Sequence, residues 1–130
     1  MSAASDYLED AVLDHVLGNT TYTPAGTLYL GLWTADDGLE AGTLTSECSG
    51  GAYARQSITF DAASGGSADS AATVTFPAAT SNWGTITHVA IMDAASAGEV
   101  LFHGAVTTSK TIESGDTFQV SAGNLTISLA

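Results

Sequence analysis

The sequence predicts a mainly β domain, an antiparallel, jelly-roll-like β-sandwich with one N-terminal α-helix. Three observations support this fold class. Short apolar or alternating segments recur along the chain with turn residues between them. A helical repeat occurs only near the N-terminus, and strands do not alternate with helices as βαβ units require. The 130 residues fit a single domain, so we expect one sandwich over residues 1–130.

The N-terminal segment has the pattern of an amphipathic helix over residues 6–17. Asp6 and Glu9 have the spacing of a capping box, and Gly18 with Asn19 supplies a stop. Between these signals, apolar residues recur at helical spacing. The stripe consists of Leu8, Ala11, Val12, His15 and Val16, widened by Tyr7, Leu13 and Leu17. A stripe of this kind must pack on the domain or on a partner.

The remaining chain reads as strands and polar loops. Strand patterns cover residues 27–34, 53–60, 72–76, 86–92, 100–106, 117–120 and 125–129. Residues 39–52 and 64–70 are dense in Gly, Ser and Thr, which is typical of loops. The last two strands are expected to form a hairpin around residues 121–124.

The charge balance is extreme, with 14 acidic residues against 2 basic ones and a formal net charge of −12. Phosphate binding needs Lys and Arg, so nucleic acid is excluded as a direct partner, and an anionic membrane would repel the chain. Unbalanced charge destabilises a compact fold unless salt screens it. We therefore interpret the composition as that of a protein adapted to high salt, against the alternative of an ordinary acidic protein.

No catalytic, cofactor or metal site is expected. The motifs of hydrolases and phosphate loops do not occur. Cys48 lies in a Ser/Gly-rich loop and reads as a small loop residue. His88 and His103 could meet across adjacent strands and bind a metal with Asp93. We expect instead that both are ordinary strand histidines with hydrogen-bond partners. Two acidic groups could hold Ca²⁺ but read better as solvated faces: Asp36, Asp37 and Glu40, and Asp6, Glu9, Asp10 and Asp14.

Interface candidates lie on the helix and at one tryptophan. They are Tyr7, Leu8, Val12, His15, Val16 and Trp83. We expect Trp33 to be core and Trp83, between Asn82 and Gly84, to be more exposed and available to stack on a sugar ring. Arg55, one of two cations and central in a predicted strand, is expected to anchor a structural ion pair.

Several segments resemble a family of small virion proteins of tailed viruses, with members described as tail-fibre-like or as capsid decoration proteins. The similar segments include SDYLEDAVLDHVL, GGAYARQSITF and NWGTITHVAIMDAA. The resemblance spans nearly the whole chain and implies a β-sandwich, self-association and no catalysis. The scarcity of basic residues departs from the family and fits a virus of a halophilic archaeon.

The resemblance gives two functional hypotheses. The favoured one is a capsid decoration or turret (cement) protein on the capsid surface, which self-associates as a trimer or pentamer and contacts the major capsid protein or other virion proteins. The second is a tail component or glycan-binding receptor module. The sequence leaves the two locations open, as it does the use of the glycosylation sequons at Asn19 and Asn124.

Overall fold

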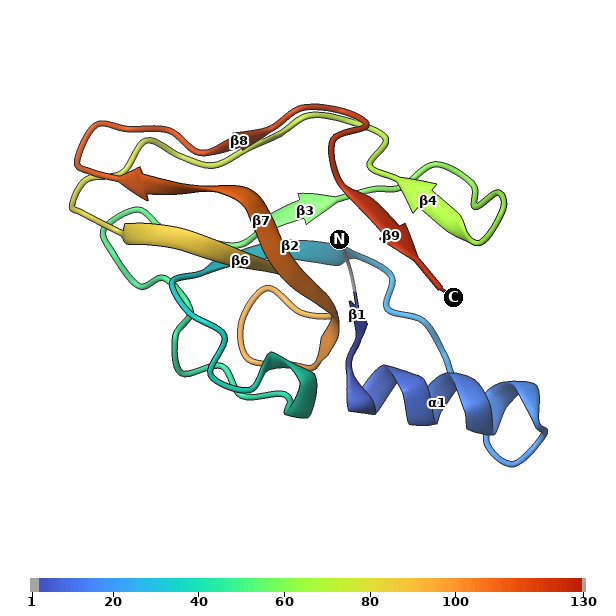
Figure 1. Cartoon of the computed structure of the whole chain (residues 1–130). Coiled ribbons are helices and arrows are strands. Elements are labelled where there is room, and N and C mark those ends of the chain that lie inside the picture. Colours follow the sequence, from blue (N-terminus) through green and yellow to red (C-terminus); the bar gives the residue numbers. More distant parts are fainter. Residues whose placement is uncertain (1–2, 130) are drawn as a thin grey trace.

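The computed structural model describes residues 3–129 and shows a mainly β, sandwich-like fold with one helix near the N-terminus (Figure 1). The strands are β1 (Ala3–Ala4), β2 (Leu28–Trp33), β3 (Gln56–Ile58), β4 (Ser67–Asp69), β5 (Val74–Thr75), β6 (Gly84–Met92), β7 (Val100–Ile112), β8 (Gln119–Val120) and β9 (Thr126–Ser128). The helices are α1 (Asp6–Val16) and a 3₁₀ turn, η1 (Leu39–Ala41). Among the described helices, none is long and apolar enough to span a membrane.

The main layer is a five-stranded antiparallel sheet in the order β1-β7-β6-β2-β3. Strand β2 shows how its two faces are filled, because successive side chains alternate across a sheet. Leu30 and Leu32 point into the larger core, whereas Tyr29 and Trp33 belong to a smaller core on the opposite face. Trp33 is 1% exposed, which confirms its predicted place in the core.

The second layer consists of two short strand pairs, β4-β9 and β5-β8. The predicted hairpin between residues 117–120 and 125–129 is wrong, because β8 pairs with β5 and β9 pairs with β4. Ser70 provides the physical reason. Its backbone N–H donates to the Leu125 carbonyl (2.8 Å), and its Oγ accepts from the N–H groups of Gly123 (3.1 Å) and Leu125 (3.3 Å). These bonds turn the chain away from β8 and toward β4, which lies inside a predicted loop.

The larger core lies between the two layers. It is built from aliphatic side chains of the main sheet and aromatic side chains of the second layer, among them Leu30, Ile86, Ile91, Phe76 and Phe118. The smaller core lies under the segment of residues 34–55, where Leu39 of η1 covers Trp33 and Met92. Both faces of the main sheet are thus covered.

Helix α1 agrees with the predicted element, but its cap does not. Ser5, rather than Asp6, is the N-cap, and its Oγ accepts a hydrogen bond from the Leu8 N–H (3.2 Å). The same hydroxyl donates to the Val100 carbonyl of β7, which fixes the start of the helix to the sheet. Gly18 ends the helix with a φ of 83°, as the sequence predicted. Beyond its first turn the helix projects from the body of the molecule (Figure 1).

Candidate functional site

The most connected polar group is Arg55, which is held in a buried ion pair. Its Nε and Nη2 atoms donate to the two carboxylate oxygens of Glu47, each at 2.7 Å. Its Nη1 donates to the carbonyls of Ala94 and Ala97, each at 2.8 Å. The guanidinium therefore fastens the turn between β6 and β7 to the loop that precedes β3.

Tyr53 extends this network to strand β2. Its hydroxyl donates to Glu47 Oε2 (2.7 Å) and accepts from the Leu32 N–H (3.0 Å). Burial raises the pKa of Tyr53, as does the Glu47 carboxylate. Burial alone would lower the pKa of Arg55, but the hydrogen bonds and charge of Glu47 more than offset this and raise it. Every charge in the network thus has a partner within the chain, which indicates a structural role.

The sequence identified Arg55 but not its partners Glu47 and Tyr53. Glu47 lies eight residues away in a segment read as a loop, so no strand register could align the two side chains. The one available signal was the excess of acidic over basic residues. A buried cation needs an anionic partner, and this chain offers many carboxylates.

Trp83 is only 4% exposed, so its predicted exposure is wrong. Its indole N–H donates to the Gly51 carbonyl (2.9 Å), and its ring packs edge-on against Tyr53 and Phe76, with centroids 5.4 Å and 6.3 Å away. Gly50 lies so close that a Cβ there would overlap the indole ring. Gly50 thus packs against the ring and the Gly51 carbonyl accepts its N–H, an approach that no sequence pattern indicated.

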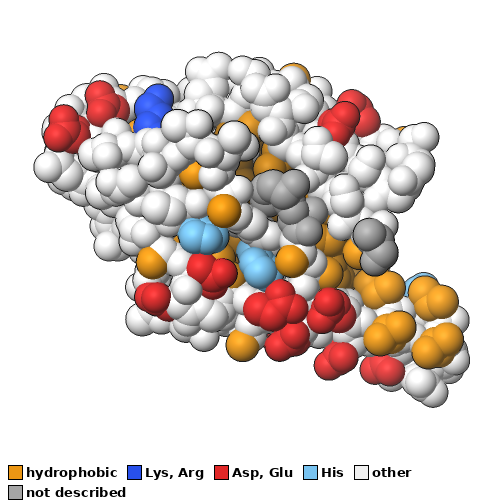
Figure 2. Space-filling model, viewed as in Figure 1, with side chains coloured by type: hydrophobic (Ala, Val, Ile, Leu, Met, Phe, Trp, Pro, Cys, Tyr) orange, Lys and Arg blue, Asp and Glu red, His pale blue; other side chains and the backbone are white. Residues whose placement is uncertain are grey.

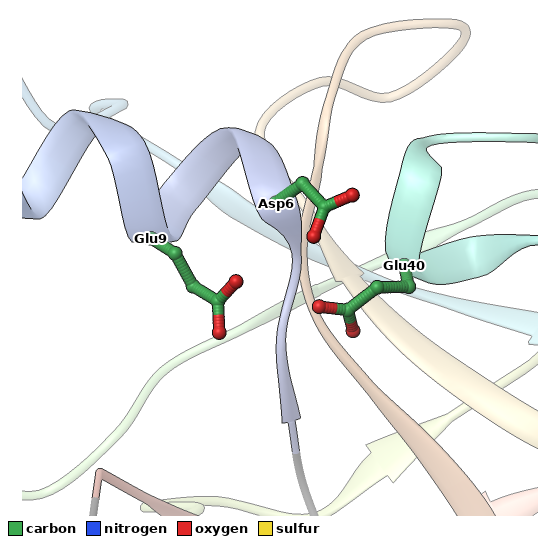
Figure 3. A group of neighbouring side chains, drawn as sticks. All are labelled: Asp6, Glu9 and Glu40. Carbon is green, nitrogen blue, oxygen red and sulfur yellow. The ribbon is translucent and has the colours of Figure 1, made fainter.

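Three carboxylates from two elements meet beside the helix N-terminus (Figure 3). Oxygens of Asp6, Glu9 and Glu40 all lie within 4.8 Å of one another. A hydrogen bond with Glu40 raises the pKa of Asp6, as do desolvation and the negative charges of Glu40 and Asp10. The sequence assigned Glu40 to a separate acidic group, because nothing in the sequence indicated that η1 packs beside α1.

Carboxylate oxygens are ligands for Ca²⁺ and Mg²⁺, so this cluster offers three of the oxygens that such an ion takes. Glu40 already has another partner, since its Oε2 lies 2.6 Å from Nε2 of the buried His103. Exposed acidic groups are common at helix N-termini, where the dipole favours them. The arrangement is explained by that preference together with the His103 contact.

The two histidines and the aspartate considered as metal ligands lie in separate environments. His103 stands opposite Ala90 and His88 opposite Ala105, and His88 Nδ1 lies 2.9 Å from Thr87 Oγ1 rather than sharing a partner with His103. Asp93 Oδ1 accepts the Glu99 N–H (2.8 Å) and closes the turn between β6 and β7.

Cys48 lacks the environment of a reactive thiol. It is 6% exposed, and burial, followed by the nearby Glu47 charge, raises its pKa to about 12. The thiolate, which is the reactive form of cysteine, is therefore scarce at neutral pH.

The helix residues predicted for an interface divide into two groups. Leu8 is 6% exposed and packs on the body, so it presents no surface to a partner, while Val12 is half-buried. Tyr7 and Val16 are exposed, and His15 is exposed with its Nδ1 accepting the Tyr22 N–H (3.1 Å). The structure adds three exposed apolar residues that were not among the candidates: Leu13, Leu17 and Leu129. Figure 2 shows hydrophobic side chains gathered over the far end of this helix.

A polar groove lies between helix α1 and the segment that follows it. Tyr7 and Tyr22 line it together with two carboxylates and three hydroxyls, those of Asp10, Asp14, Thr20, Thr21 and Thr23. Burial raises the pKa of Tyr22, with smaller contributions from Tyr7 and Asp93. The groove combines aromatic rings with hydrogen-bonding groups.

In a comparison with known protein families, a family model matches residues 3–128. The matching family is described as Podophage GP4 fiber I protein gp80. The chain belongs to this family. No curated protein matches the chain.

Membership in a fibre protein family indicates a virion structural protein of a tailed virus, with a tail-fibre-like role. This agrees with the resemblance seen in the sequence. It favours the tail over the capsid shell, the reverse of the order expected from the sequence.

Proposed function

We propose that this chain is a non-catalytic structural component of a viral tail fibre. The observation that carries the proposal is the match to a fibre protein family over residues 3–128. The polar groups support it, because Arg55, Glu47 and Tyr53 hold one another and backbone atoms of their own chain. The buried Cys48 thiol is equally unsuited to catalysis.

The partners of such a component are other virion proteins and further copies of the chain. The exposed apolar face of α1 supports this, because monomeric proteins rarely leave large apolar side chains gathered on one element. Nucleic acid remains an unsuitable partner, since Arg55 is buried and Lys110 alone among the basic residues is exposed.

Copy number per virion tests the fibre proposal against capsid decoration. Quantitative mass spectrometry of purified virions would compare this chain with the major capsid protein. A fibre component is expected at a small fraction of the capsid protein. A ratio close to that of the capsid protein would contradict the proposal and restore the decoration reading.

A second candidate function is glycan binding by the polar groove. Tyr7 and Tyr22 are placed to stack on a sugar ring, while Asp10, Asp14 and the threonines are placed to bond its hydroxyls. This location replaces Trp83, which is buried. A glycan array in molar KCl, run with wild type and Tyr7→Ala, tests it. Binding lost in Tyr7→Ala supports the groove, and binding by neither protein contradicts it.

We further propose that the host lives in high salt. The net charge of −12 is the support, because neighbouring carboxylates repel one another unless dissolved ions screen them.

A further inference from the structure

The far end of helix α1 presents an apolar surface that its own chain leaves uncovered. Leu13 is 56% exposed, and Val16 and Leu17 are each 70% exposed. We call these three residues the helix tip. Val16 and Leu17 lie three and four positions after Leu13, so the three residues share one side of the helix end.

The same molecule carries an apolar groove of about 290 Å³ between the β4-β9 pair and the main sheet. Its described lining residues include no charged side chain. The larger ones include Leu28, Phe60, Ile91, Leu101, Phe102 and Ile127. Leu129 also lines a neighbouring hollow with Leu13 and Val12, so the groove and the helix side are continuous.

The tip does not fill the groove of its own chain. Ser5 and the buried Leu8 fix the first turn of α1 to β7 and the body, and the helix then runs outward (Figure 1). The large exposure of Val16 and Leu17 shows that their side chains remain in solvent. Neither of these two side chains therefore enters the groove of its own chain.

Charge decides which surface of a second copy fits against the tip. Helix α1 carries Asp6, Glu9, Asp10 and Asp14, so two tips packed together would bring two sets of carboxylates close. The residues that line the groove itself carry no charge, and the carboxylate of the adjoining hollow is that of Glu9. Between two copies that each carry −12, contact is least opposed where one partner surface is neutral.

We propose that the helix tip of one copy seats in the apolar groove of another, and that this contact holds copies together in the fibre. The proposal rests on the proposed fibre function and adds the surfaces that join its subunits. Because tip and groove are different surfaces, each copy has one of each to offer.

The test uses one variant for each surface and measures molar mass by light scattering during size-exclusion chromatography in molar KCl. Leu17→Asp places a charge on the tip, and Ala63→Trp fills the groove from an exposed lining position. Wild type is expected to associate, and each variant to raise the Kd of self-association by roughly 30-fold or more, as for a hot-spot residue. Thr107→Asp, at an exposed position on β7, is the matched control and should associate as wild type does.

Mixing the variants separates this contact from its alternatives. Leu17→Asp retains a groove and Ala63→Trp retains a tip, so the mixture should form a two-chain complex that neither forms alone. Association that survives Ala63→Trp but not Leu17→Asp would mean tip-to-tip packing and overturn the proposal. A monomeric wild type would overturn it too, without bearing on the copy number that tests fibre membership.

A fluorescent apolar dye, anilinonaphthalene sulfonate, reports whether the groove is occupied. Its fluorescence should be low with associated wild type, rise with Leu17→Asp as the groove is vacated, and stay low with Ala63→Trp. Equal fluorescence with wild type and Leu17→Asp would show that no second copy fills the groove, leaving it as a site for a small apolar ligand. Circular dichroism of each variant, matching wild type, verifies that the fold is intact.

Discussion

The two cations of this chain have opposite environments. The Arg55 side chain is 2% exposed and makes hydrogen bonds to Glu47, Ala94 and Ala97, while Lys110 lies exposed on β7. A forked guanidinium satisfies a carboxylate and two carbonyls at once, which a lysine ammonium does with less fixed geometry. Arg55 thereby joins the loop before β3 to the turn between β6 and β7, whose carbonyls lie 39 and 42 residues further along the chain.

Replacing Arg55 with Met should destabilise the fold by about 3–5 kcal/mol, because the Glu47 carboxylate would be left without its buried partner. Urea unfolding followed by tryptophan fluorescence at fixed KCl concentration measures this. Lys110→Met is the matched control and should change the free energy of unfolding by less than about 0.5 kcal/mol. Equal effects of the two substitutions would contradict the role given to Arg55.

Gly50 should not tolerate even a methyl group. A Cβ at this position would overlap the Trp83 ring and lie 2.9 Å from the Asn82 carbonyl oxygen. Gly50→Ala is therefore expected to cost about 1–3 kcal/mol of stability, the usual range for overpacking.

Gly26→Ala is the control for Gly50→Ala, since a Cβ at Gly26 meets no atom within 4 Å. Thermal unfolding of the two variants measures the difference. If both melt together with wild type, the close approach of Gly50 to Trp83 is wrong.

The role of a residue was predictable where the composition left few residues that could fill that role. Arg55 stood out because the chain has only two cations, and its ion pair followed from the cost of burying a lone charge. The burial of Trp83 was not predictable, because it depends on Gly50 and Gly51 arriving from a loop distant in sequence. The meeting of Asp6 with Glu40 depends in the same way on tertiary packing.

At the scale of elements, helix α1 depends on its attachment to the sheet. Its 11 residues fall below the length at which an isolated helix is stable in water, about 12–15 residues. Ser5 supplies both the N-cap and the bond to Val100, and it is 1% exposed.

Ser5→Ala should therefore loosen the helix, with a loss of about 1 kcal/mol, typical for removal of a cap. Hydrogen–deuterium exchange should become faster across Asp6–Val16 while exchange in β6 changes little. Ser109→Ala, at an exposed position on β7, is the control. Unchanged exchange in the helix of Ser5→Ala would show that Ser5 does not hold it.

Local patterns predicted the elements better than their pairing. The 3.6-residue repeat located α1, an alternating run rich in Leu, Tyr and Trp located β2, and apolar runs located β6 and the first half of β7. The register of the short strands could not be predicted, because two or three residues carry too little pattern to select a partner. Hydrogen bonds to Ser70 direct β9 to its partner. Ser70 lies in a predicted loop, and nothing in the sequence distinguishes it from the other serines there.

At the scale of the whole molecule, charge repulsion opposes folding, and salt should relieve it. Between about 0.1 M and about 1 M KCl the Debye length falls from about 10 Å to about 3 Å. The urea midpoint should therefore rise steadily over this range. An unchanged midpoint would remove the argument for a saline environment.

A variant with amides at four exposed acidic positions separates two effects of salt. One is the screening of charge repulsion, and the other is the general effect of salt on the burial of apolar surface. Asp10, Asp14 and Asp61 become Asn, and Glu113 becomes Gln, which removes four negative charges from a net of −12. The rise of its urea midpoint with KCl should be smaller than that of wild type. An equal rise would assign the effect to burial rather than to charge.

Family membership supports the inference that this chain is a structural component of a tail fibre. Immunogold electron microscopy of intact virions, with an antibody raised against the purified chain, tests it most directly. Gold particles are expected at the tail, with none over the capsid shell. Particles distributed over the shell would contradict it.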